Sequence, residues 1–258
     1  MAGPHAATPV SPVLFYSILA VSAVVTSFIS GILGMAGGMI LMGILLAIMP
    51  VPAAMMLHGV TQLASNGWRA LLWRNDVQWR VFRGYALGAI VSLVVFAALQ
   101  LVVSKPVSLL VMGSTPFIAL VLPESLHLNV ERKGHSFACG VISSALALLS
   151  GVSGPILDVF FVRSLMGRHA VVATKAMTQS FSHILKIIYF GVIVAAERHG
   201  TVDPWIGAMM VVLAFTGTSL AAPVLKRMND KSFRQWTRWT VMTLGVFYLA
   251  SGVMMLLH

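Results

Sequence analysis

The chain has 258 residues, of which 58% are hydrophobic and only 9% are charged. Soluble domains carry about 25% charged residues, so this composition excludes a soluble globular protein and predicts a chain that sits in lipid. The formal net charge of +10 does not indicate nucleic-acid binding, because most Lys and Arg lie in short segments between apolar runs. A membrane protein that obeys the positive-inside rule shows this pattern.

Long apolar runs follow one another along the chain, and most approach or exceed the roughly 17 residues that a spanning helix needs. Two of them are too long for one span, and glycines interrupt both. In chain order, the runs are Val13–Met49 (broken at Gly31–Gly38), Ala53–Trp73, Val81–Val103, Val107–Leu122, His135–Met166 (broken at Ser150–Pro155), Ala170–Ala196, Pro204–Leu225 and Trp236–Leu257. We therefore predict an all-α, polytopic membrane helix bundle.

The two interrupted runs are parts of a repeat. Gly34-x-x-Gly37 recurs as Gly151-x-x-Gly154 at an offset of 117 residues. The same offset, without a gap, relates Thr61-Gln62 to Thr178-Gln179, Asn66 to His183, Arg69 to Lys186 and His58 to Lys175. Matched halves with a broken hydrophobic segment at the same place are typical of secondary transporters. We predict one membrane domain of two repeats, residues 1–122 and 123–258, each a broken-helix hairpin plus three transmembrane helices.

Charge predicts how the two repeats are oriented. Four basic segments should face the cytoplasm, whereas the N-terminus, the Lys105 loop and the Glu197–Asp203 loop should face outward. The basic segments are Arg69–Arg83, Arg132–Lys133, Arg163–Arg168 and Lys226–Arg238. Each repeat then crosses the membrane three times, so the second repeat is inverted and both termini lie outside. Whether each hairpin arm stops at the midplane stays open.

The glycine-rich breaks predict an anion site. Each precedes a short apolar helix, so each break presents a helix N-terminus with unpaired N–H groups and a positive dipole end. Two such N-termini that meet near the bilayer centre would bind an anion. The residues concerned are Gly34, Gly37, Gly38, Gly151, Ser153 and Gly154. The alternative is that these glycines only let helices pack closely.

Polar residues inside the spans extend this predicted site. Thr61, Gln62, Thr178 and Gln179 lie about nine residues into their spans, near the midplane, where they either bind the substrate or bond neighbouring helices. A charge deep in a span marks function by default, which singles out Lys186. His183 shares a helix face with it, and Asn66 and Arg69 are the equivalents in the first repeat.

Ion coupling has three candidate residues: Asp158, His58 and Lys175. Asp158 lies in the first turn after the second break, where it serves as a proton acceptor, caps the helix dipole or pairs with a buried Lys. We predict no metal, no cofactor and no catalytic residue. The expected partners are a small anion, membrane lipid and protons as the coupling ion, with no nucleic acid.

A second class of function starts from Gly151-Val-Ser153-Gly154. This segment reads as the GxSG of an intramembrane serine protease, with His183 as the candidate base. The repeat disfavours it, because Ala36 and Asn66 stand at the equivalent positions in the first half.

Gly31–Gly38, Pro50–Ala53 and His58–Asn66 resemble the sulfite exporter TauE/SafE family of bacterial membrane permeases, and Ser150–Pro155 and Thr174–Lys186 repeat the pattern. The resemblance covers nearly the whole chain. It implies outward, ion-coupled transport of sulfite or small organosulfonates across a bacterial inner membrane, in which both outward-facing termini would be periplasmic. Pro155 replaces the glycine found at Gly38, so the two half-sites differ. The residues alone imply only a small anion, and a small carboxylate permease or a passive anion channel stays open.

Overall fold

The computed structural model describes residues 11–123, 126, 128–194, 202–227 and 230–257, and this part of the chain is helical without a strand. The helices are α1 (Pro12–Leu33), α2 (Met35–Ile48), α3 (Val51–Leu72), α4 (Trp79–Leu99), α5 (Lys105–Val121), α6 (His135–Ser150), α7 (Gly154–Phe161), α8 (Arg168–Ile188), α10 (Pro204–Arg227) and α11 (Asp230–Leu257). A π-helical segment, Tyr189–Val194, continues α8. The all-α prediction is confirmed.

Five stretches of helix are long and apolar enough to cross a membrane: Pro12–Leu33, Trp79–Leu99, Arg168–Val194, Pro204–Ala221 and Gln235–Leu257. The shorter helices α2, α5 and α6 are also apolar. Helix α3 has the 22 residues of a full span, but its polar residues make it less apolar than these five. The chain is therefore a multi-pass membrane protein.

Several helix boundaries differ from the sequence-based expectation: α4 ends at Leu99 and not at Val103, and α7 ends at Phe161 and not at Met166. The segment Lys226–Arg238, predicted as a loop, is mostly helix: α10 ends at Arg227 and α11 begins at Asp230. Lys and Arg are good helix formers, so a spanning helix can continue past the apolar segment with a charged end. The predicted Glu197–Asp203 loop, the N-terminal ten residues and the last two residues of the Ala170–Ala196 span lie wholly or mainly outside the described residues.

Both hairpins break at the predicted glycines, but their arms are unequal. The first breaks at Gly34 between α1 and α2, and the second breaks over 151–153 between α6 and α7. Helix α1, with 22 residues, is about 33 Å long and can cross the hydrocarbon core. Helix α7 has only 8 residues, so it is about 12 Å long and cannot.

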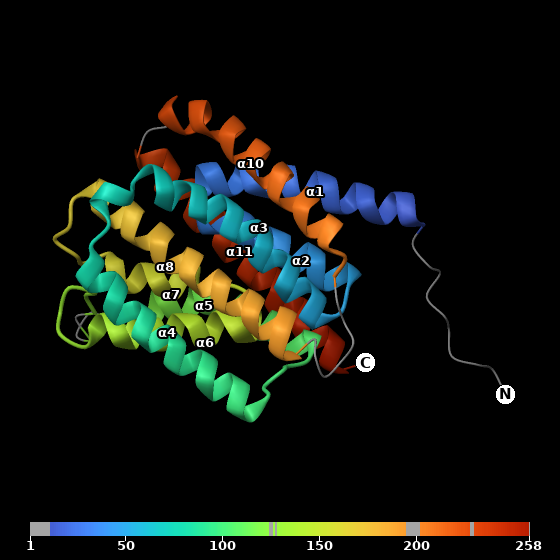
Figure 1. The fold of residues 1–258 in the computed structure, drawn as a ribbon, viewed down its shortest axis with the longest axis horizontal. Coiled ribbons are helices and arrows are strands. Elements are labelled where there is room, and N and C mark those ends of the chain that lie inside the picture. The colour runs from blue at the N-terminus through green and yellow to red at the C-terminus, as the bar shows by residue number, and fades with distance from the viewer. Residues whose placement is uncertain (1–10, 124–125, 127, 195–201, 228–229, 258) are drawn as a thin grey trace.

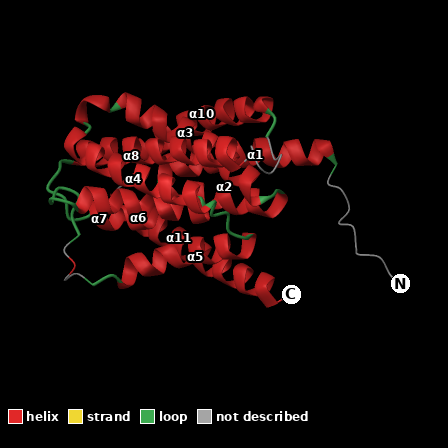
Figure 2. Cartoon of the chain, turned by 60° about the horizontal axis from the view of Figure 1, so that its bottom comes forward, coloured by secondary structure: helices red, strands yellow, loops and turns green. Residues whose placement is uncertain are grey.

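The helix pairs are symmetric between the two halves of the chain. Helix α1 packs along α10 and α6 packs along α4, while α3 pairs with α8 and α5 with α11 (Figures 1 and 2). The counterparts in the two halves are α1 and α6, α3 and α8, α4 and α10, and α5 and α11. If each helix is replaced by its counterpart, the set of pairs is unchanged. A two-fold axis that relates the two halves would produce this pattern. Glycines allow the close approach: a Cβ on Gly88 of α4 would overlap the Phe137 carbonyl of α6, and a Cβ on Gly217 of α10 would overlap the Val24 carbonyl of α1.

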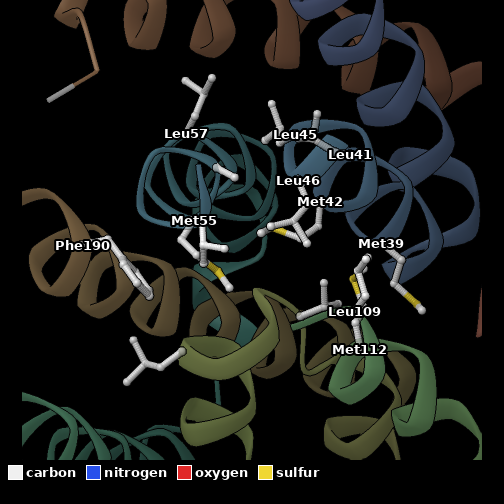
Figure 3. Close-up of a cluster of buried hydrophobic side chains, with 14 of the residues drawn as sticks. Met39, Leu41, Met42, Leu45, Leu46, Met55, Leu57, Leu109, Met112 and Phe190 are labelled. Atoms are coloured by element: carbon white, nitrogen blue, oxygen red, sulfur yellow. The ribbon is translucent and has the colours of Figure 1, made fainter. Parts of the chain in front are cut away.

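A methionine-rich apolar core lies beyond the first break. Met39 and Met42 of α2 pack with Met55 of α3 and Met112 of α5 (Figure 3). All four side chains are fully buried. Helix α2 runs away from the break, and α3 returns towards the basic loop at Arg74. The core therefore lies on one side of the break, and the basic loop lies on the other.

Candidate functional site

A cavity of about 250 Å³ lies where the tips of the two hairpins meet. Both tips contribute to its wall: Gly34 and Met35 before and at the start of α2, and residues 151–154 leading into α7. The tips touch, because a Cβ on Gly154 would lie 2.6 Å from the Met35 Cβ. The rest of the wall consists of Leu33, Gly38, His58, Gln62, Asn66, Arg69, Asp158, Val171, Val172, Lys175, Ala176, Gln179, Ser182, His183 and Thr237.

Backbone geometry explains two of the tip glycines. Gly34 has φ +66° and Gly151 has φ +83°, a region that residues with a Cβ rarely adopt. Gly37 has a different role, since a Cβ there would overlap the Thr26 carbonyl and Ser30 of α1. Gly37 therefore allows α1 and α2 to pack closely, and it does not line the cavity.

The N-termini of α2 and α7 open towards the cavity without a side-chain cap. Neither helix has a capping side-chain hydrogen bond, although Ser153 occupies the N-cap position of α7. The first-turn N–H groups of such helices have no acceptor within the helix, and an anion can accept hydrogen bonds from them.

Helical periodicity brings the predicted polar residues together. On α3, Gln62, Asn66 and Arg69 are spaced by four and three residues; on α8, Lys175, Gln179 and His183 are spaced by four. Residues at these spacings share one helix face. Because α3 packs against α8, the polar face of α3 and the polar face of α8 lie side by side in the cavity wall.

Several buried polar atoms on this wall have no hydrogen-bond partner within the described residues. They are Gln62 Nε2, Arg69 Nε, His183 Nδ1 and Thr237 Oγ1. Arg69 is held in place by a 2.5 Å hydrogen bond from Nη2 to Asn66 Oδ1. Buried polar groups are nearly always paired, so a cluster of unpaired ones around a cavity points to a bound polar ligand.

Lys186 lies directly behind the cavity wall and does not line it. Its Nζ lies 2.6 Å from His58 Nδ1 and donates to the Gly151 carbonyl at 3.0 Å. His58 Nε2 lies 3.0 Å from the Gly38 carbonyl oxygen. This buried group therefore joins α3, α8 and both hairpin tips, and Lys186 has no exposed surface.

Asp158 forms an ion pair with Lys175, and both line the cavity. The structure thus gives Asp158 a lysine partner, which is Lys175 and not the deeper Lys186. The predicted position in the first helical turn is wrong: α7 already begins at Gly154, which places Asp158 in the second turn.

Some predicted residues lie away from the cavity wall, and some wall residues were not predicted. Thr61 and Thr178 donate to carbonyls of their own helices, Leu57 at 2.8 Å and Lys175 at 2.9 Å. Thr237 and Ser182 line the cavity without having been predicted. Ser182 repeats Ser65 at the 117-residue offset, which could have indicated it, whereas Thr237 has apolar Leu120 as its equivalent and no such signal.

Ser153 and His183, the pair that a protease would need, both line the cavity. Within the described residues, no hydrogen bond joins them, and His183 Nδ1 is unpaired. The described residues also contain no group of three or more His, Cys, Asp or Glu side chains that could hold a metal ion.

Comparison with protein-family models identifies a family for this chain. The model of the sulfite exporter TauE/SafE family matches residues 19–248, which include every residue that lines the cavity. No curated protein and no solved structure matches the chain. Because the family match covers most of its length, the chain belongs to the sulfite exporter TauE/SafE family of membrane transporters.

Proposed function

We propose that this protein exports a small oxyanion, sulfite or a short organosulfonate, by alternating access around the cavity at the hairpin tips. One observation carries the proposal: Gln62 Nε2 and Arg69 Nε, both N–H donors of residues that line one cavity, are buried without a partner in the described chain. His183 and Thr237 can donate there as well. An oxyanion, which only accepts hydrogen bonds, suits such a set.

Size and charge support the same ligand class. At about 250 Å³, the cavity is slightly smaller than the usual range of about 300–1,000 Å³ for small-molecule sites. Its wall, as far as the structure describes it, has two basic side chains, Arg69 and Lys175, and one carboxylate, Asp158, which already pairs with Lys175. Arg69 therefore leaves a net positive site. A guanidinium fork matches the oxygens of sulfite or a sulfonate.

The cavity lies towards the basic loops, which supports a state that faces the cytoplasm. Arg69 is in the last turn of α3, next to the Arg74 turn, and Lys175 lies in the first half of α8, about two turns after its start. By the positive-inside rule these ends are cytoplasmic. On the opposite side, the Met39–Met42–Met55–Met112 core blocks the path. We propose that the two halves form an inverted repeat, that both termini are periplasmic, and that moving one half against the other opens this core outward.

Counterflow in proteoliposomes tests the function. Vesicles loaded with unlabelled sulfite should accumulate labelled sulfite from outside, and sulfite or methanesulfonate should compete. The Arg69→Met variant should lose most of this exchange. Arg83→Met is the matched control, because Arg83 is exposed on α4 and does not line the cavity. Competition by acetate alone would favour the carboxylate permease.

Two further alternatives have separate tests. A passive anion channel would release sulfite without exchange and without a response to a pH gradient. An intramembrane serine protease would react at Ser153 with a fluorophosphonate probe, and Ser153→Ala would abolish labelling. We expect exchange without labelling.

A further inference from the structure

We propose that Lys186 and His58 form the proton-carrying pair of the transporter: Lys186 takes up one proton when the anion enters the cavity and releases it when the anion leaves. This inference rests on the proposed function, since it concerns the same cavity. It differs from the sequence-based expectation that Lys186 contacts the anion directly.

The hydrogen bonds define which atom carries the proton. The Gly38 carbonyl can only accept, so His58 Nε2 must hold a hydrogen to bond it at 3.0 Å. In the neutral ring Nδ1 is then an acceptor, and it faces Lys186 Nζ at 2.6 Å. Lys186 also donates to the Gly151 carbonyl. An added proton therefore resides on Lys186 Nζ, because the resulting ammonium can donate to two acceptors, His58 Nδ1 and the Gly151 carbonyl oxygen.

No carboxylate among the described residues balances this ammonium. Among the residues that the structure describes, Asp158 is the only carboxylate on the cavity wall, and it is paired with Lys175. The described salt bridges do not include Lys186, and its side chain has no exposed surface. A buried charge is expensive unless an opposite charge lies near it. The opposite charge that can arrive is the anion in the cavity.

The position of the pair couples the two events. His58 and Gly151 line the cavity, and Lys186 touches both from behind. An anion at the wall therefore lies one residue away from the ammonium and stabilises it. By linkage, the protonated pair also binds the anion more tightly, and the two effects are equal in free energy. The proton comes from the bulk solvent by way of the cavity, whose wall includes His58.

Other titratable groups surround the pair and must be separated from it. His183 on α8 has its ring 5.8 Å from the His58 ring. Arg69 on α3 and the Asp158–Lys175 pair between α7 and α8 line the same cavity. Helix α2, which presents the Gly38 carbonyl, has no titratable side chain, and the His135 and Cys139 of α6 lie more than two helical turns before Gly151.

Proton uptake on binding tests this inference. Purified transporter in weakly buffered detergent solution is mixed with methanesulfonate, whose own charge does not change near neutral pH, and an indicator dye records the pH change. The measurement is repeated across the neutral pH range. We expect uptake on the order of one proton per bound anion at its maximum. Binding without proton uptake at any pH would overturn the inference but not the proposed function, whereas absence of binding would overturn the proposed function.

Lys186→Arg is the decisive variant. Arginine keeps a cation that can donate to His58 and Gly151, but it does not lose its proton in proteins. This variant should bind methanesulfonate and take up no proton. Lys186→Met should also take up none, and should bind the anion more weakly per folded molecule. His169→Gln is the control, because His169 stacks on Trp73 away from the cavity and should leave proton uptake unchanged. Full proton uptake in Lys186→Arg would assign the proton elsewhere and overturn the inference.

A purely structural Lys186 makes a different prediction. If Lys186 only fastens the Gly151 tip, Lys186→Arg would retain both anion binding and proton uptake, and Lys186→Met would lower the unfolding temperature without changing uptake per bound anion. His183→Gln serves as a second check: proton uptake should persist in it, although anion affinity should fall. Loss of uptake in His183→Gln alone would place the proton on His183.

Discussion

Asp158 and Lys175 form an ion pair at the cavity wall, between the second turn of α7 and the part of α8 two turns after its start. Both side chains are partly exposed, with 39% and 26% of their surface accessible. The pair therefore contributes little to stability. Its main effect is on the cavity, where Asp158 repels an incoming anion and offsets the attraction of Lys175.

Removing the carboxylate should tighten anion binding. Asp158→Asn should increase sulfite affinity roughly threefold to tenfold, because an effect on the order of 1 kcal/mol is expected for one charge near a partly screened site. Lys175→Met should weaken it by a similar factor. The double variant Asp158→Asn/Lys175→Met restores the net charge and should bind nearly as the unmodified protein does. Weaker binding in Asp158→Asn would show that this carboxylate holds the site together. Isothermal calorimetry on purified protein measures all three.

Arg69 should account for much of the anion affinity. Arg69→Met removes a charged donor and should weaken sulfite binding by roughly tenfold to a hundredfold, or about 1.5–3 kcal/mol. Arg69→Lys keeps the charge but lacks the Nε donor that has no partner in the described chain, so it should retain only part of the affinity. Asn66→Ala should cause a smaller loss, since Asn66 only orients Arg69. Equal affinities for Arg69→Met and Arg83→Met would remove Arg69 from the site.

The sequence predicts much of this arrangement because the repeat encodes it. Both hairpin breaks follow from the glycines, and Gln62, Asn66 and Arg69 come to one wall with Gln179 and His183 because both sets keep their helical spacing. These features depend on local chemistry and periodicity, which one sequence displays.

The different fates of Arg69 and Lys186 could not be predicted from the repeat. The residue that faces Lys186 is His58, whose ring nitrogen can accept a hydrogen bond. The equivalent of His58 in the second repeat is Lys175, whose side chain cannot accept a hydrogen bond from Arg69. Lys175 instead finds Asp158, for which the first repeat has buried Leu41. Two substitutions between the repeats therefore bury one cation and leave the other facing the cavity.

The orientation of the chain should be measurable with cysteines. The single native Cys139 is fully buried, so background labelling should be low. Cysteine introduced at Leu257, which is 77% exposed, should react with an impermeant maleimide added outside intact cells. Cysteine at Lys133, exposed in a basic loop, should react only after the membrane is opened. The opposite pattern would reverse the direction that we propose for the cavity.

Variants of the tip glycines should distinguish an effect on helix packing from an effect on anion binding. In Gly37→Ala, the new Cβ would meet the Thr26 carbonyl and Ser30 of α1, so the variant should unfold at a lower temperature. Its sulfite affinity per folded molecule should stay close to normal, because Gly37 does not line the cavity. Gly34→Ala meets no atom within 4 Å, but its φ of +66° should destabilise the fold by roughly 1–3 kcal/mol.

Gly154→Ala should behave differently, because its Cβ would press on Met35 at the point where the two tips touch. Pushing the tips apart should displace the N–H groups of α2 and α7 from the anion, and a misplaced donor loses most of its hydrogen bond. We therefore expect a roughly tenfold loss of sulfite affinity, about 1.4 kcal/mol, in protein that remains folded. Thermal unfolding and binding measured on the same sample separate the two effects. Normal affinity in Gly154→Ala together with a large loss in Gly37→Ala would place the anion on the α1 side of α2 and away from the cavity.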